Sequence, residues 1–302
     1  MSSSPLVLPR QKSRVVTRLT DYLELSKPRI ATLVLVTVAV SYSAAAWGQP
    51  QPWLLVHVLL GTSLIAASAS ALNQYLERHL DSLMPRTAER PLAAGRLNEV
   101  ETVLLAVCWL VAGCGYLTIA LGMRPAVFGF LTWLLYVCVY TPLKVRTPLN
   151  TAVGAFAGAL PVFIGWTAEG ARLDLRAGGL FAILFLWQFP HFMAIAWLYR
   201  HQYSRVGMRM LTVVDPSGWW AGWQAVIAAV VLVPVSLIPV LNLPGLGGIV
   251  YGLAVSLLGI GQVVCAIAFL RQRDRDSARR LLHASLIYLP SLLLLLTLVP
   301  WM

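Results

Sequence analysis

Charged residues are scarce in this sequence of 302 residues. Asp, Glu, Lys and Arg make up 12% of the chain, whereas 58% is hydrophobic. A soluble domain carries about 25% charged residues, so this composition excludes that class. The apolar residues are gathered into runs of roughly 17 to 24, the length that spans a hydrocarbon core of about 30 Å. The sequence therefore predicts an all-α polytopic membrane protein.

Cysteine is also scarce, with four residues, at positions 108, 114, 138 and 265. No CxxC pair and no Cys/His metal spacing occurs, so neither a zinc module nor a disulfide framework is indicated. All four lie in apolar runs, where ordinary buried thiols are expected.

The apolar runs predict nine membrane spans. Residues 1–29 lack an apolar core, so a conventional signal peptide is not expected. We expect a basic cytoplasmic segment at 1–29 and a single transmembrane domain at 30–302. The expected spans are 30–47, 52–75, 100–121, 124–141, 149–168, 178–198, 221–240, 246–269 and 281–300.

Lysine and arginine are distributed unequally between the two sides of these spans. One side, which includes the amino terminus, holds 20 of the 23. By the positive-inside rule that side is cytoplasmic, which places the carboxyl terminus outside. The net charge of +11 then belongs to a membrane surface, where anionic lipid headgroups are the ordinary partner. No nucleic-acid module lies between the basic clusters, so nucleic acid is not expected as a partner.

An unusual polar stretch, residues 73–95, follows the second span. Asn73, Glu77 and Asp81 are spaced by four, so a continuing helix would place them on one face. Carboxylate and carbonyl oxygens suit magnesium, which binds through one or two carboxylates plus substrate phosphates. Arg86 and Arg90 follow in the same loop and could neutralise an anionic substrate. This combination suits an enzyme that ionises a lipid diphosphate.

Two other span ends carry polar side chains. Tyr140 and Lys144 end the fourth span, where an interfacial tyrosine and a snorkelling lysine are equally good explanations. His191 lies in the inner half of the sixth span, and Tyr199 follows at its end. Polar groups at membrane depth need a partner or a cavity, so His191 is either a packing residue or a functional one.

Several segments, in order, carry a resemblance to a known family. The pattern NxxxExxxD followed by MPRTxxRPLxxG is similar to the first aspartate-rich motif of the UbiA-type intramembrane prenyltransferases. Its continuation resembles the branch of that family that farnesylates protohaem IX. The other matching segments are KPRI at 27–30, YTPLKVRTPLNTAVGAFAGALP at 140–161, FPHF at 189–192, YRHQYSRVGMRML at 199–211 and HASLIYLP at 283–290.

The resemblance implies a bundle of nine helices and a Mg2+-dependent transfer of farnesyl from farnesyl diphosphate to a vinyl group of haem B. It implies a bacterial inner-membrane location and makes a haem A synthase, which would receive the product, a candidate partner. The implied metal ligands and catalytic residues are Asn73, Glu77 and Asp81, with Lys144 also catalytic and Gln202 at a second metal site. The implied diphosphate-binding residues are Arg86, Arg90, Tyr140, Lys144, Arg146 and Arg200, and the implied haem contacts are His191 and Tyr199.

Two positions depart from the family pattern. Glu77 stands where aspartate is usual, and Gln202 stands where many relatives have aspartate. Glutamine brings no charge, so the second metal site is in question. The alternatives are a prenyltransferase for another acceptor, such as a quinone precursor, and a transporter or assembly scaffold. A transporter would favour polar groups near the membrane midplane, which this sequence lacks.

Overall fold

The computed structural model describes residues 14–47, 49–241 and 245–298, and within them helices are the only regular secondary structure. Two parts of the expected segments lie outside the described residues. They are residues 1–13 of the basic segment and the last residues of the ninth span. Eight helices or helical pairs are long and apolar enough to cross a membrane, and a shorter apolar helix of 17 residues stands in the place of the seventh expected span. The all-α polytopic architecture is therefore confirmed.

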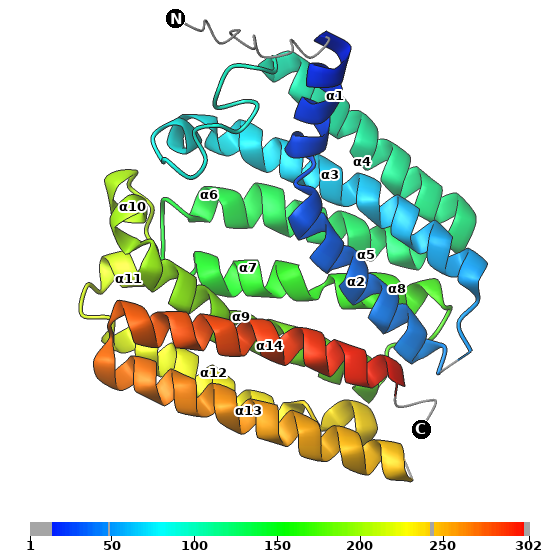
Figure 1. Ribbon diagram of the computed structural model, residues 1–302. Coiled ribbons are helices and arrows are strands. Elements are labelled where there is room, and N and C mark those ends of the chain that lie inside the picture. Colours follow the sequence, from blue (N-terminus) through cyan, green and yellow to red (C-terminus); the bar gives the residue numbers. More distant parts are fainter. Residues whose placement is uncertain (1–13, 48, 242–244, 299–302) are drawn as a thin grey trace, which may run out of the picture.

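The helices run back and forth through one bundle (Figure 1). The bounds of the spanning helices lie within a few residues of the expected spans, with two exceptions. The helix of the second span continues past residue 75 to Ser82, and the helix of the ninth span begins at Arg275, before residue 281. The first half contains α1 (Arg14–Leu25), α2 (Pro28–Ala45), α3 (Pro52–Ser82), α4 (Glu99–Leu121), α5 (Met123–Leu134), the π-helical turn η1 (Leu135–Tyr140), α6 (Thr141–Leu143) and α7 (Asn150–Ala159). The second half contains α8 (Pro161–Ala168), α9 (Leu175–Leu198), α10 (Arg200–Arg205), α11 (Leu211–Val214), α12 (Trp219–Val235), the 3-10 turn η2 (Ile238–Val240), α13 (Leu246–Gln272) and α14 (Arg275–Leu298).

Helix ends are set by local sequence signals. Pro28 and Pro52 stand in the first turns of α2 and α3, where the missing amide hydrogen is not needed. The Asn98 side chain accepts a hydrogen bond from the Val100 amide at 2.8 Å, and Asp174 accepts one from the Ala177 amide at 3.0 Å. These side chains cap α4 and α9 because they satisfy amides that lack a helical partner.

Close packing joins the helices of the bundle. A Cβ added to Gly113 of α4 would lie 2.9 Å from the Gly61 carbonyl oxygen of α3, so the two glycines allow the backbones to touch. The outer surface is apolar: Ile119 is 90% exposed and Leu257 is 73% exposed. An apolar surface on such a bundle is the surface that meets lipid. The protein is thus an integral, multi-pass membrane protein.

One end of the bundle carries the polar connections. This loop end comprises residues 83–98 after α3, residues 144–149 after α6, and residues 199–218, which include α10 and α11 (Figure 1). The segments are bonded to one another: the Arg209 amide donates to the Lys144 carbonyl oxygen at 2.7 Å, and Asn150 Nδ2 donates to the Arg209 carbonyl oxygen at 3.1 Å. The loop end is therefore a connected surface.

Candidate functional site

The α3 helix continues through the polar stretch to Ser82, and its last turns hold the expected oxygen donors. Asn73, Glu77 and Asp81 are all buried, with exposed fractions of 1%, 5% and 1%. Their spacing of four places them along one helix face. Because buried acids are unfavourable unless they are paired, each requires a partner nearby.

Each donor is bonded to a cation from a different segment. Lys144 Nζ lies 2.6 Å from Glu77 Oε1, and Arg90 Nη1 lies 2.7 and 2.6 Å from the two Asp81 carboxylate oxygens. Lys27 Nζ lies 2.6 Å from Asn73 Oδ1. Residues 27, 90 and 144 thus bring three basic side chains to one helix face, and two carboxylates lie among them.

Sequence reasoning assigned no role at the site to Lys27, which was named only as part of the matching segment KPRI at 27–30. The residue precedes α2 with φ 51° and ψ 63°, a left-handed conformation that costs a side-chain-bearing residue energy. Burial, together with the nearby charges of Arg90 and Lys144, lowers the pKa of Lys27 to about 7. The one available sequence signal was its place directly before Pro28, a residue that fixes the entry to the helix.

Lys144 is positioned by a break in the helical ladder. The π-helical turn inserts a residue before Tyr140, and such turns are frequent at functional sites. Thr141 donates to the Tyr136 carbonyl oxygen at 2.8 Å and accepts from Asn73 Nδ2 at 3.1 Å, which connects this turn to α3. The Tyr140 ring lies 4.7 Å from Lys144 Nζ. Burial acts to lower the pKa of Lys144, but Tyr140 and Glu77 outweigh it and raise that pKa above its ordinary value.

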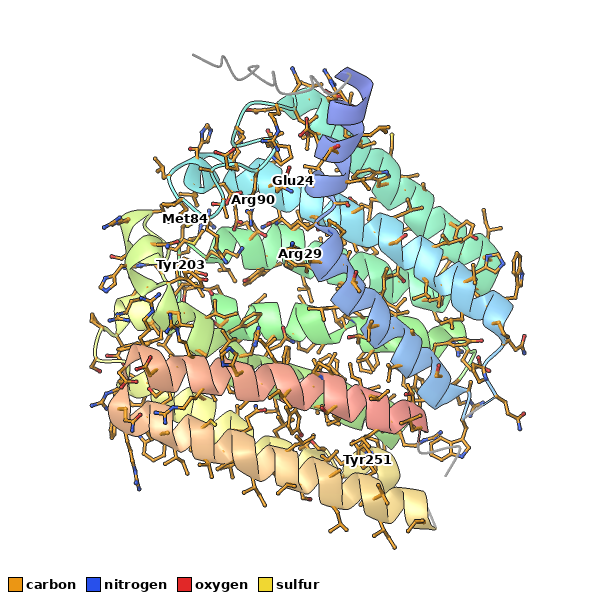
Figure 2. The ribbon with its side chains drawn as sticks, viewed as in Figure 1. Glu24, Arg29, Met84, Arg90, Tyr203 and Tyr251 are labelled. Carbon is orange, nitrogen blue, oxygen red and sulfur yellow. The ribbon has the colours of Figure 1, made fainter. Side chains whose placement is uncertain are left out.

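The loop after α3 and the segment after α9 pack together beside these pairs. Met84 and Tyr203 belong to one buried apolar cluster, and Figure 2 shows both at the same end as Arg90. The Arg86 guanidinium lies 5.0 Å from the centre of the Tyr199 ring. Arg86 is exposed, so it stands at the rim of the site rather than among the buried pairs.

His191 is fixed between α9 and α14. Its Nδ1 lies 2.9 Å from Ser285 Oγ, and its ring is stacked on Trp187 at 4.7 Å. The Ser285 hydroxyl also lies 2.7 Å from the Leu282 carbonyl oxygen, to which it can donate its single hydrogen. With that hydrogen on Leu282, His191 donates from Nδ1 to Ser285, and in this tautomer the Nε2 lone pair is available, as a metal ligand requires.

Residues 34–292 match the UbiA prenyltransferase family. The chain belongs to that family. It is 42% identical over 282 residues to the protohaem IX farnesyltransferase of Rhodopirellula baltica, covering 91% of this chain and 98% of that protein. It is 39% identical over 300 residues to the protohaem IX farnesyltransferase of Koribacter versatilis, covering 96% of each.

Solved structures of the UbiA family share the fold. A digeranylgeranylglyceryl phosphate synthase matches with a TM-score of 0.79 at 14% identity, covering 94% of this chain and 99% of that one. A UbiA homologue from Archaeoglobus fulgidus bound to DMAPP and Mg2+ matches with a TM-score of 0.69 at 15% identity, covering 93% and 99%. At these identities the likeness concerns the fold.

The oxygen donors of this UbiA family member fit a magnesium ion. Two carboxylates and one amide oxygen are hard ligands, and Mg2+ leaves its other positions to water and substrate phosphates. No group of three His, Cys, Asp or Glu side chains is gathered anywhere in the part of the chain that the structure describes. An ion here would therefore depend on a substrate's oxygens to complete its coordination.

For three residues expected at the site, the described part of the chain shows no side-chain hydrogen bond, ion pair or ring contact with the site residues on α3 or with Lys27, Arg90 and Lys144. Arg200 donates to the Trp197 carbonyl oxygen at 3.0 Å and covers the Trp197 ring, and Arg146 is exposed. Gln202 lies half-buried in α10 without a side-chain bond to a described residue. Asp215, the acid nearest in the chain, instead accepts from the Trp220 amide at 3.0 Å and caps α12.

Proposed function

We propose that this protein transfers a farnesyl group from farnesyl diphosphate to a vinyl group of haem B, which gives haem O. The observation that carries the proposal is the set of buried oxygens of Asn73, Glu77 and Asp81, each within 2.7 Å of a basic side chain. This set lies at the loop end of a membrane bundle of the UbiA family. Relatives named protohaem IX farnesyltransferase, 39–42% identical over most of the chain, support haem B as the acceptor.

Asn73, Glu77 and Asp81 would hold the magnesium ion. A bound Mg2+ neutralises charge on a diphosphate and so assists its departure. Gln202 would offer a carbonyl oxygen to a second ion, a role that stays a prediction.

Lys27, Arg90 and Lys144 would bind the diphosphate. Their donors already lie 2.6 to 2.7 Å from the oxygens of α3, so they are held where the phosphate oxygens would meet the metal ligands. Cations fixed in a buried site stabilise the negative charge that develops as the bond from farnesyl C1 to oxygen breaks. Arg86 would add a charge at the rim, and Tyr140 would position Lys144.

The transfer needs no oxidant or reductant, because each bond that breaks is matched by one that forms. The diphosphate leaves with the electron pair of the C1–O bond, and the vinyl group attacks C1 through its terminal carbon. Water then adds to the inner vinyl carbon and loses a proton, which gives the hydroxyethylfarnesyl group. His191 would hold the acceptor by binding its iron through Nε2, and Tyr199 would contact it from the end of α9.

The membrane orientation is also part of the proposal. The excess of lysine and arginine on the side of the loop end supports a cytoplasmic location for it, with the amino terminus inside. A bacterial inner membrane is the expected compartment. A complex with haem A synthase stays a prediction.

Extraction of haems from a host that lacks haem O synthesis tests the proposal. We expect haem O to appear when this chain is produced and to be absent with Asp81→Asn produced at the same membrane level. If haem B alone is found while the chain is present and folded, the proposal is wrong. If a prenylated quinone precursor accumulates instead, the acceptor is different.

A further inference from the structure

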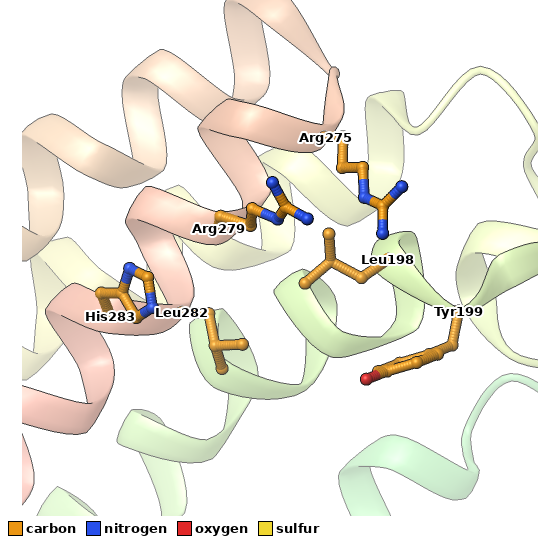
Figure 3. A pocket seen from close by; sticks show the side chains of 6 residues that line it. All are labelled: Leu198, Tyr199, Arg275, Arg279, Leu282 and His283. Atoms are coloured by element: carbon orange, nitrogen blue, oxygen red, sulfur yellow. The ribbon is translucent and has the colours of Figure 1, made fainter. Parts of the chain in front are cut away.

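A cavity of about 260 Å³ opens between the end of α9 and the first turns of α14. Figure 3 shows that its polar side chains come mainly from α14, while α9 contributes Leu198 and Tyr199 follows at its end. The lining residues are Leu198, Tyr199, Arg275, Arg279, Leu282 and His283. None of the buried ion pairs on α3 belongs to this lining, so the cavity is a separate feature.

Two arginines and one histidine supply the polar lining of the cavity beside Tyr199. Arg275, Arg279 and His283 are spaced by four and therefore lie along one side of α14. Arg275 and His283 make no hydrogen bond or ion pair with any described residue, and Arg279 has only an exposed contact with Asp276 at 3.9 Å. Residues 271–280 contain five arginines and two aspartates, so the surrounding segment is positive as well. This lining suits an anion.

The cavity adjoins both parts of the proposed reaction site. Tyr199 lines it, and the same ring lies 5.0 Å from the guanidinium of Arg86 at the rim of the diphosphate site. His191 precedes Leu198 by seven residues on α9, which corresponds to about 10 Å along the helix. That separation is of the order of the distance between a porphyrin's centre and its carboxylates.

We infer that this cavity binds the two propionate carboxylates of the porphyrin acceptor, an inference that rests on haem B being the acceptor. Arg275 and Arg279 would each form charge-assisted hydrogen bonds with a carboxylate. Leu198 and Leu282 provide apolar contact for the adjoining edge of the ring. A pocket for a whole ligand usually exceeds about 300 Å³, so this cavity accepts the polar edge while the macrocycle extends toward His191.

The test compares haem B with its dimethyl ester, which lacks the carboxylate charges. Binding to the full-length protein in nanodiscs of neutral lipid is followed by the absorption of the haem, without turnover. The variant is Arg275→Gln/Arg279→Gln, and the matched control is Arg271→Gln, an exposed arginine of the same segment that does not line the cavity.

We expect the double variant to bind haem B about 10- to 100-fold more weakly, as lost hydrogen bonds between charged groups imply. The ester should bind the wild-type protein with a similar deficit and should lose nothing further in the variant. The affinity for farnesyl diphosphate should not change.

Three results would overturn the inference. They are unchanged haem B affinity in the variant, an equal loss for haem B and the ester, and weakened farnesyl diphosphate binding with haem binding intact. The binding measurement is repeated in nanodiscs that contain anionic lipid. A difference between the double variant and the wild-type protein that appears only in those nanodiscs would assign the cavity to a lipid headgroup and would also overturn the inference. Haem binding is measured without turnover. A failure to form haem O would therefore count against the proposed function, while the binding result would still test the inference about the cavity.

Discussion

The buried ion pair between Lys144 and Glu77 predicts how much stability the protein loses when one partner is removed. In Lys144→Met the Glu77 carboxylate, 5% exposed as a residue, loses the cation 2.6 Å away. Removing one partner of a buried pair costs about 3–5 kcal/mol, because the other charge stays buried. Glu77 can limit this loss by taking up a proton, but it then loses the charge that a magnesium ligand needs. We expect lower stability and loss of farnesyl transfer together.

A double variant separates the effect of the pair from a general loss of stability. Glu77→Gln/Lys144→Met removes both charges, so its free energy of unfolding should return to within about 1 kcal/mol of the wild-type value while activity stays absent. The control is Arg78→Met, also on α3, which breaks the more exposed pair with Glu99 of α4 and should cost about 0–1 kcal/mol. Denaturant unfolding in nanodiscs measures the four proteins. Equal stability of Lys144→Met and the control, or a double variant as unstable as Lys144→Met, would refute the reasoning.

Four further predictions address single positions. Asp81→Asn should abolish turnover while the protein still folds and inserts, and retained activity would remove Asp81 from the metal site. Lys27→Met should raise the KM for farnesyl diphosphate about 10- to 100-fold because a charged donor is lost, and an unchanged KM would exclude a contact with substrate. Gln202→Asp should preserve or raise activity if this position meets a second ion, as steady-state rates at limiting Mg2+ would show; a severe loss would indicate another role. Asp215→Ala should lower the free energy of unfolding by about 1 kcal/mol through the lost cap of α12, without changing turnover. Hydrogen bonds from Ser217 and Trp220 outweigh burial and lower the pKa of Asp215, so its stabilising contribution is present above the ordinary pKa and is lost as pH falls through the lowered one.

The helices of the bundle could be predicted from sequence because the bilayer imposes a simple rule. An apolar run of fixed length must cross it, and basic residues mark one side. The amphipathic α1 was not expected, since it is too polar to register as a span. Its signal was the recurrence of Leu19, Tyr22 and Leu23 between charged residues. Arg96 fixes this helix to the loop end through Asp21 at 2.8 Å.

The part of the site that lies on a single helix could be predicted from sequence, because residue spacing along a helix determines which side chains share a face. The spacing of Asn73, Glu77 and Asp81 needed only the continuation of α3, which the structure contains. The pairing of each with a cation depends on three separate segments, so local sequence could not assign Lys27 to Asn73. The place of Arg200 within the matching segment 199–211 gives no information about the Trp197 ring that it covers.

The most direct test of the account uses purified protein in nanodiscs with haem B, farnesyl diphosphate and Mg2+. Mass spectrometry follows the haem, and a diphosphate assay follows the leaving group. We expect haem O and diphosphate in equal amounts, both abolished by chelation of Mg2+ and by Asp81→Asn. Haem B that stays unmodified although both substrates bind, or haem O formed equally well without a divalent ion, would contradict the account.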